Sequence, residues 1–400
     1  MTGNPKTSIP LAEFVALTAL VFSVVALAID AMLPALAQIG QELGAAHAND
    51  AQLIISIFFF GIVFGQAFFG PFSDSKGRKP AIYIGFAVFA LGCLVSIFSS
   101  SFSEMLAGRF LQGLGAAGPR IVIVALIRDK FEGREMARIM SFVISIFILV
   151  PIVAPAMGQA LLIVADWRAI FYSFLLLTII ALIWLSLRQE ETLAPEHRIP
   201  FSPRRVVGRV REIGGTRVTM GYTLVTGFMT GAFLGYLNSS QQIFQLQYGL
   251  GRMFPLYFAV LAFSFGLATL LNSQLVLHFG MRRLAGSALV IITVISIAFL
   301  PISWLFNGHP PLWTLMAYLL LAFFAVGMLF GNLNALAMEP LGRVAGTGSA
   351  FIGSVSTLIA VLAGTVIGQS YNGSVLPIPV GFAALSLLSL FSMRWAETGR

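Results

Sequence analysis

The chain has 400 residues, of which 58% are apolar and only 10% are charged, and its formal net charge is +8. Soluble globular domains are about 25% charged, so this composition excludes an ordinary soluble domain and predicts a protein that lies in a lipid bilayer. The single cysteine, Cys93, excludes a disulfide framework or a cysteine-based metal site within one chain.

Twelve apolar segments, each close to the ~20 residues that a helix needs to cross a bilayer, follow one another along the chain. The first is too long for the core of a signal peptide and lacks a small-residue cleavage site, so we expect it to remain as a helix. The sequence therefore predicts an all-α polytopic membrane protein. Its twelve transmembrane helices are expected at residues 11–34, 51–72, 81–98, 103–127, 138–163, 168–187, 218–240, 253–275, 284–305, 312–336, 347–370 and 375–393.

Basic residues concentrate between these segments, on the side of the membrane where the N-terminus lies. Only Arg168 and Arg252 fall in segments on the opposite side, so the bias predicts that both termini are cytoplasmic and explains the positive charge without nucleic-acid binding. The longest polar segment divides the helices six and six. We therefore expect an N-terminal six-helix bundle at 1–187, a cytoplasmic linker at 188–217 and a C-terminal six-helix bundle at 218–400.

A short charged segment, GPFSDSKGRK, separates the second and third expected helices. Gly70 and Gly77 allow a tight turn and close backbone approach. Asp74 can accept hydrogen bonds at a helix start, while Arg78 and Lys79 can bind acids or lipid phosphates on the same side. The alternative is a solvated loop that only follows the positive-inside rule. A weakly similar segment, GMRR, follows the eighth expected helix. Duplication of a six-helix unit would produce such a similarity between the two halves of the chain.

Asp30 lies near the outer end of the first expected helix. An ionisable group inside a span indicates a functional site, because it is costly unless it faces a cavity or a partner. A carboxyl group in a low-dielectric cavity favours its neutral form, which would let Asp30 bind and release a proton near neutral pH. The alternative is an interfacial position, one turn from Pro34, in contact with headgroup water.

Two arginines lie inside the helix expected at 103–127. Arg109 is at a depth similar to that of Asp30, so the two could pair; snorkelling to the outer interface is the alternative. Arg120 follows on the same face, about 16 Å deeper by helical rise, where the two arginines would line one wall. Arg120 could instead donate to carbonyl groups freed by a kink at Pro119.

Proline and glycine in the helix expected at 138–163 predict a bend and close packing, notably at Pro155 and Gly158. Several polar side chains within the spans are candidates for a substrate cavity, although single amides more often join neighbouring helices. The predicted cavity residues are Gln112, Arg120, Gln159, Tyr236, Asn238, Asn332 and Asn334.

Four segments together resemble the Bcr/CflA branch of the major facilitator superfamily, which contains twelve-helix drug:proton antiporters. They are AIDAMLPALAQIGQELG, GQAFFGPFSDSKGRKPAIYIG, RFLQGLGAAGPRIVIVALIRD and VPIVAPAMGQAL. The motifs cover most of the first half, whereas the second half matches chiefly in layout and in NLNALAMEPLGRVAGTGSA. The resemblance implies the major facilitator fold and transport by alternating access.

The resemblance also implies roles for individual residues. Asp30 and Arg109 would be the acid and the arginine of proton coupling. A conformational motif would include a charge cluster that contacts the start of the helix expected at 347–370 and stabilises the outward-open state. The residues of this conformational motif are Gly70, Asp74, Gly77, Arg78, Lys79 and Asp129, with Pro155 and Gly158 in the bending helix. Arg120 departs from the family pattern, because that place is usually small or apolar.

The sequence therefore predicts a secondary active transporter of a bacterial inner membrane that exports drugs or small amphipathic molecules in exchange for protons, as a monomer and without cofactor or metal. A proton-coupled or facilitative transporter of a specific metabolite is the alternative, and a non-transporting membrane sensor is a more remote one. An enzyme is disfavoured, because the four histidines lie in separate loops and no phosphate-binding Gly-Lys motif is present.

Overall fold

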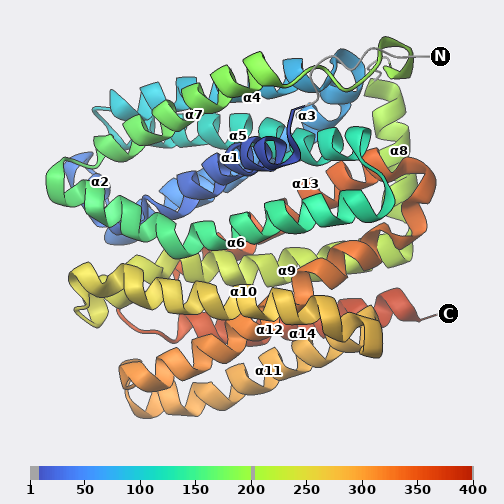
Figure 1. Cartoon of the computed structure of the whole chain (residues 1–400). Helices are drawn as coiled ribbons and strands as arrows, with labels where there is room; N and C mark the ends of the chain where they lie inside the picture. Colours follow the sequence, from blue (N-terminus) through green and yellow to red (C-terminus); the bar gives the residue numbers. More distant parts are fainter. Residues whose placement is uncertain (1–8, 200–202, 399–400) are drawn as a thin grey trace.

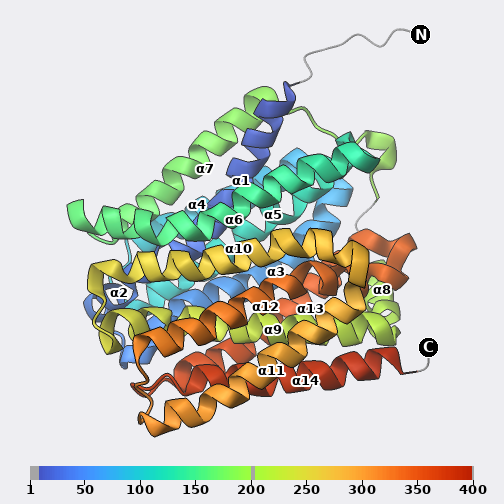
Figure 2. The same cartoon turned by 60° about the horizontal axis from the view of Figure 1, so that its bottom comes forward.

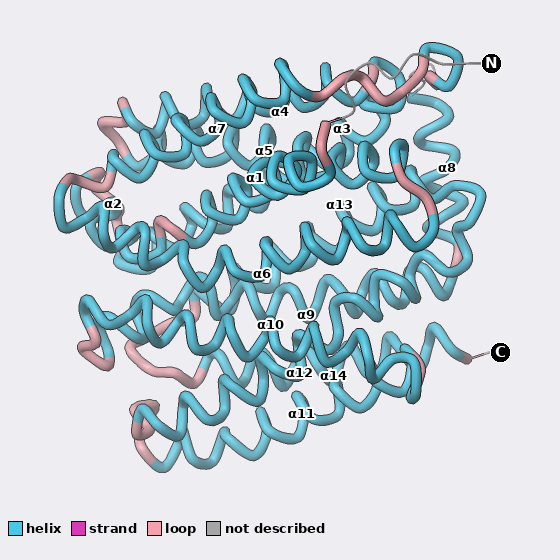
Figure 3. Tube along the Cα trace, in the orientation of Figure 1, coloured by secondary structure: helices cyan, strands magenta, loops and turns pink. Residues whose placement is uncertain are grey.

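The computed structural model describes residues 9–199 and 203–398, so the ends of the two expected bundles at 1–8 and 399–400 and part of the expected linker lie outside it. The regular elements of the described residues are all helical, and the connecting segments gather at the two ends of the molecule (Figure 3). The long helices are α1 (Leu11–Asp30), α3 (Leu53–Lys76), α4 (Arg78–Ile97), α5 (Phe102–Lys130), α6 (Gly133–Val164), α7 (Arg168–Arg188), α9 (Arg217–Gln241), α10 (Phe254–Phe279), α11 (Met281–Leu305), α12 (Leu312–Met338), α13 (Ala345–Gln369) and α14 (Pro377–Glu397).

These twelve described helices correspond one for one to the predicted spans, which confirms the fold class. Ten of them are long and apolar enough to cross a membrane by length and composition. The other two are α6 and α9, which are 32 and 25 residues long. Helix α9 is less apolar because it is rich in glycine, threonine and serine, and most of its residues pack against protein rather than lipid.

The helices form two layers that meet along a shared interface (Figure 1). Helices α1 and α3 to α7 pack among themselves, as do α9 to α14. Between the layers, α3 packs against α13 and α6 packs against α10, and Figure 2 shows the second pair side by side. This is the predicted arrangement of two six-helix bundles.

Short elements mark the two ends of the molecule (Figure 1). One end carries α2 (Leu36–Glu42) with η1 (Leu33–Ala35) and η2 (Ala48–Gln52); the other carries α8 (Pro203–Gly215). We call them the α2 end and the α8 end. The expected polar linker therefore contains a helix, which Pro203 begins, since proline is well suited to the first turn.

Two expected boundaries were wrong. The first helix ends at Asp30 rather than at residue 34, because the chain turns into η1 with Pro34 in its first turn. The expected turn between the second and third spans shrinks to one residue, since α3 continues through Pro71 to Lys76. Gly77 alone separates α3 from α4, with a φ of 110° that favours glycine.

Glycines bring α5 into backbone contact with two neighbours. A side chain at Gly113 would overlap the carbonyl oxygen of Phe58 in α3, and one at Gly115 would overlap the backbone of α4 around Phe89. Small residues allow this close approach in membrane helices. Helix α5 is therefore held firmly between α3 and α4, which fixes the direction in which its arginines point.

Candidate functional site

Asp30 is the last residue of α1 and lies inside the protein. Its exposed fraction is 6%, and the residues that follow it, Ala31 and Met32, are fully buried. Its carboxyl group makes no hydrogen bond or ion pair with the part of the chain that the structure describes. The position is therefore an interior one, and it differs from the interfacial alternative.

Arg109 is fully buried beside the end of α1, but it does not pair with Asp30. Its guanidinium donates to the carbonyl oxygens of Ala28 at 3.0 Å and Ile54 at 3.1 Å, and to Oε1 of Gln112 at 2.5 Å. The last carbonyl groups of a helix have no intrahelical partner, so arginine is a suitable donor there. Arg109 therefore holds the end of α1, and complete burial excludes snorkelling.

Residues of both bundles converge on Asp30. Tyr236 of α9 lies within electrostatic range of this carboxyl group, and its buried hydroxyl has no hydrogen-bond partner. Element η1, just after Asp30, contacts α9. Gly158 of α6 packs so closely on the backbone of Ala31 that any side chain there would overlap its carbonyl oxygen. Asp30 therefore sits where α1, α6 and α9 meet.

Arg120 is half-buried in the half of α5 that is nearer the α8 end. It makes no hydrogen bond or ion pair with any residue in the described ranges, so the expected alternative of bonds to freed carbonyl groups is not observed. Helix α5 runs through Pro119 without a break.

The other predicted cavity residues divide into two groups. Three of them join helices: Gln112 of α5 donates to Ser96 of α4, Asn332 exchanges two hydrogen bonds with Asn272, and Asn238 donates to Ser56 and to Gly364. By contrast, Gln159, Tyr236 and Asn334 have no hydrogen-bond partner among the described residues. The second group is the one free to bind another molecule.

At the α2 end, carboxamides connect the two bundles. Gln52 donates to Gln242, which in turn donates to Oδ1 of Asn49 at 2.9 Å. Asn49 donates to the carbonyl oxygens of Gln369 at 3.1 Å and Tyr371 at 2.7 Å. A partly open cleft of about 240 Å³, lined in part by Gln52 and Gln242, lies beside this amide network. Sequence reasoning missed the network, because its members lie far apart in the chain.

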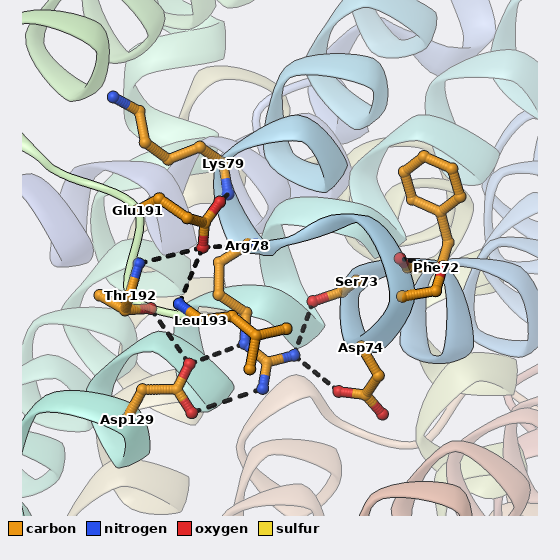
Figure 4. A network of polar contacts seen from close by, with 10 residues as sticks. Phe72, Ser73, Asp74, Arg78, Lys79, Asp129, Glu191, Thr192 and Leu193 are labelled. Atoms are coloured by element: carbon orange, nitrogen blue, oxygen red, sulfur yellow. Dashed lines mark hydrogen bonds and ion pairs between the residues drawn. The ribbon is translucent and has the colours of Figure 1, made fainter. Parts of the chain in front are cut away.

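A charge cluster lies at the α8 end of the first bundle (Figure 4). Arg78 is 7% exposed; its Nε lies 2.7 Å from Oδ2 of Asp129, and its Nη1 lies 2.7 Å from Oδ1 of Asp74. Glu191, which the sequence did not single out, accepts the backbone N–H groups of Arg78 and Lys79 at 2.8 and 2.9 Å. The structure thus brings the predicted Asp74, Arg78 and Asp129 together and adds a carboxylate from the linker.

The charge cluster adjoins the start of α13 in the other bundle. A Cβ atom at Gly346 would lie 3.6 Å from Oδ2 of Asp74, and one at Gly70 would lie 3.4 Å from Cβ of Ala350. Carboxylates are favoured near a helix N-terminus. The contact falls beside the expected segment, Thr347 to Ser349.

The second bundle repeats the arrangement. Arg282 lies 2.5 Å from Glu339 and 3.0 Å from Glu397, while the hydroxyl of Tyr222 donates to Glu397 at 2.6 Å. As in the first bundle, a glycine with positive φ, Gly280, precedes the arginine. The similarity of GMRR to the charged segment of the first bundle is therefore seen in the structure as well as in the sequence.

No group of three or more metal-ligating side chains was found among the described residues. Residues 18–364 match the Major Facilitator Superfamily. An uncharacterized MFS-type transporter, YdgK of Bacillus subtilis, is 30% identical over 93% of both chains. A bicyclomycin resistance protein homolog of Haemophilus influenzae is 28% identical over 91% of both. The structure of a D-xylose-proton symporter shares the fold, with a TM-score of 0.74 at 14% identity over 96% of both chains.

Proposed function

The chain belongs to the Major Facilitator Superfamily, and from this premise we propose that it exports drugs or small amphipathic molecules in exchange for protons. Membership in this family of transporters confirms the prediction of a multi-pass membrane transporter rather than an enzyme. The relative named for bicyclomycin resistance agrees with the predicted Bcr/CflA branch and supports a drug-like substrate.

Asp30 carries the proposal of proton coupling. An unpaired carboxylate in the interior of a membrane protein costs several kcal/mol, and a bound proton removes that cost. Because Asp30 lies where helices of both bundles meet, separation of the bundles changes its contact with water. Protonation of Asp30 and opening of the bundles are therefore coupled, with Arg109 fixing the end of α1 on which Asp30 sits.

Two sets of contacts between the bundles serve as gates in this proposal. The amide network closes the α2 end, which is the outer end if both termini are cytoplasmic. At the α8 end, the contact of the Arg78 cluster with α13 stabilises the state that opens outward. Gly158 allows α6 to pack on α1 in the present state, and Pro155 lets α6 bend when the bundles rock.

The substrate cavity in this proposal lies between the bundles, lined by the predicted residues that have no partner. Tyr236 interacts electrostatically with the proton site, whereas Gln112, Asn238 and Asn332 position the surrounding helices. The protein acts as a monomer in the bacterial inner membrane, and each bundle moves as a unit.

Reconstituted vesicles test the proposal. A panel of antibiotics and lipophilic cations is added to vesicles that carry a pH gradient, and proton movement is followed with an entrapped pH-sensitive dye. We expect at least one compound to move protons through the native protein but not through Asp30→Asn. Glu196→Gln, at an exposed position in the linker, is the control and should behave as the native protein. Substrate movement without protons would contradict antiport and favour a facilitative metabolite transporter.

A further inference from the structure

Arg120 lies inside the first bundle and has no role in the proposed proton coupling. Other buried or half-buried arginines of the described chain have partners: Arg78 binds two carboxylates, and Arg109 binds two carbonyl groups and an amide. Arg120 has no such partner within the described ranges. An uncompensated guanidinium in the low-dielectric interior is unfavourable, so its retention calls for a ligand.

The packing of α5 fixes the direction of Arg120. Gly113 marks the side of α5 that touches α3, and Gly115 marks the side that touches α4. Arg109 points between α1 and α3, since it donates to Ala28 of the first and to Ile54 of the second. Eleven residues complete about three helical turns, so Arg120 is rotated by only about 20° from Arg109 and lies about 16 Å nearer the α8 end. Arg120 therefore points to the side of α5 that faces α1 and α3, inside the first bundle, and away from α4.

The interior offers Arg120 no acid of its own. Asp30 is the one acidic residue among the fully buried side chains of the described residues, and it lies at the other end of α1, near the depth of Arg109. The acids at the α8 end, Asp74 and Asp129, already bind Arg78. A negative charge for Arg120 must come from a bound molecule.

We infer that Arg120 binds an anionic group of the transported molecule, such as a carboxylate, a sulfonate or a phosphate. This inference rests on the proposed function, and it narrows the substrate to amphipathic organic anions or zwitterions. A guanidinium donates two parallel hydrogen bonds to such an anionic group. A neutral amide group on the transported molecule would bind the guanidinium more weakly. Arg120 lies well apart from Asp30, so the anion and the proton occupy separate sites.

Three probes of matched shape test the inference: 2-naphthoate, 2-naphthamide and 2-naphthylmethylammonium. Their apparent affinities are measured at pH 7.5 from the thermal stabilisation of the full-length protein in detergent. The native protein should bind 2-naphthoate about tenfold more tightly than 2-naphthamide, as one charge-assisted hydrogen-bond pair implies. Arg120→Gln should abolish this preference and leave the affinity for 2-naphthamide unchanged. Arg120→Lys should keep part of it.

A matched control and a second readout separate binding from folding. Arg128→Gln removes an exposed charge from the same helix and should keep the full preference for 2-naphthoate. Without any probe, Arg120→Gln should melt at the same temperature as the native protein or higher, because it removes an unpaired, half-buried charge. A clear fall in melting temperature would show a structural role and overturn the inference.

The remaining outcomes distinguish this inference from antiport. If the native protein binds 2-naphthoate no better than 2-naphthamide, the anion site is wrong, even when neutral compounds still move protons in vesicles. If 2-naphthoate is preferred through Arg120 but no compound moves protons, the anion site stands and proton antiport fails.

Discussion

Arg109 Nη2 donates a hydrogen bond to the carbonyl oxygen of Ala28 over 3.0 Å, two residues before Asp30. The sequence left open whether Arg109 and Asp30 pair, and the structure shows the arginine bound to the helix backbone instead. The arginine also lies over the ring of Phe58, 4.4 Å from its centre. Arg109 thus supports the segment that carries the acid without neutralising the acid itself.

A double-mutant cycle on Arg109→Gln and Asp30→Asn should show little coupling. Arg109→Gln leaves the buried carbonyl group of Ala28 without a donor, which costs about 1–3 kcal/mol, whereas Asp30→Asn removes no described contact. We expect a large loss of thermal stability for the first change, a small effect for the second and additive effects for both. Thermal unfolding in detergent measures all three variants. A coupling above about 1 kcal/mol would show that the two side chains do pair.

Arg78→Gln and Arg282→Gln should have different consequences despite their similar surroundings. Each change strips a guanidinium from two carboxylates and should lower the melting temperature. Only Arg78 lies in the cluster that adjoins α13 of the other bundle, so only Arg78→Gln should also change the access of water to the gates. Hydrogen exchange of α3 and α13 measures that access, with the exposed Arg394→Gln as control. Equal changes in α3 and α13 for both variants would contradict the assignment.

Cross-linking Gln52→Cys to Gln242→Cys should lock the α2 end. These side chains are hydrogen-bonded across the bundle interface, so a short thiol-reactive linker can join them in the present state. The native Cys93 does not compete, because it is buried in α4 and does not line the cleft on which Gln52 and Gln242 lie. We expect the cross-link to stop transport and a reductant to restore it if the linker contains a disulfide. The pair Gln52→Cys and His278→Cys lies at opposite ends of the molecule and should not become cross-linked. Unimpaired transport by the protein cross-linked through positions 52 and 242 would contradict the role of this end as a gate.

Gly158→Ala should disturb the contact between α6 and α1. Its new methyl group would overlap the backbone of Ala31, which cannot rotate away, and overpacking of this kind costs about 1–3 kcal/mol. Gly208→Ala in α8 is the control, because no atom lies within 4 Å of the added carbon. We expect a lower melting temperature and slower transport for the first variant only, measured in detergent and in vesicles.

The sequence predicted the twelve helices well, because the bilayer sets their length and apolar character. Helix ends were less predictable, since charged residues at a membrane surface can extend a helix, as the segment from Ser73 to Lys76 does. The Arg78 cluster could be anticipated from the resemblance, because its three members lie in recognisable motifs. Glu191 could not, since a linker glutamate carries no local signal of capping a helix 113 residues away.

The amide network and the partners of Arg109 were unpredictable for a related reason. Gln52 and Gln242 are 190 residues apart, and nothing in either segment specifies the other. The backbone acceptors of Arg109 have no sequence signature at all. Interior polar residues could therefore be recognised as unusual, whereas their contacts followed only from the packing of the two bundles.

Proton release on substrate binding tests the central claim most directly. A compound that moves protons in vesicles is added to purified protein in weakly buffered detergent solution, and the pH change is compared between the native protein and Asp30→Asn. The account predicts that the native protein releases protons, while Asp30→Asn still binds the compound, as calorimetry would show, but releases none. Equal proton release from both proteins would contradict the assignment of Asp30 as the proton site.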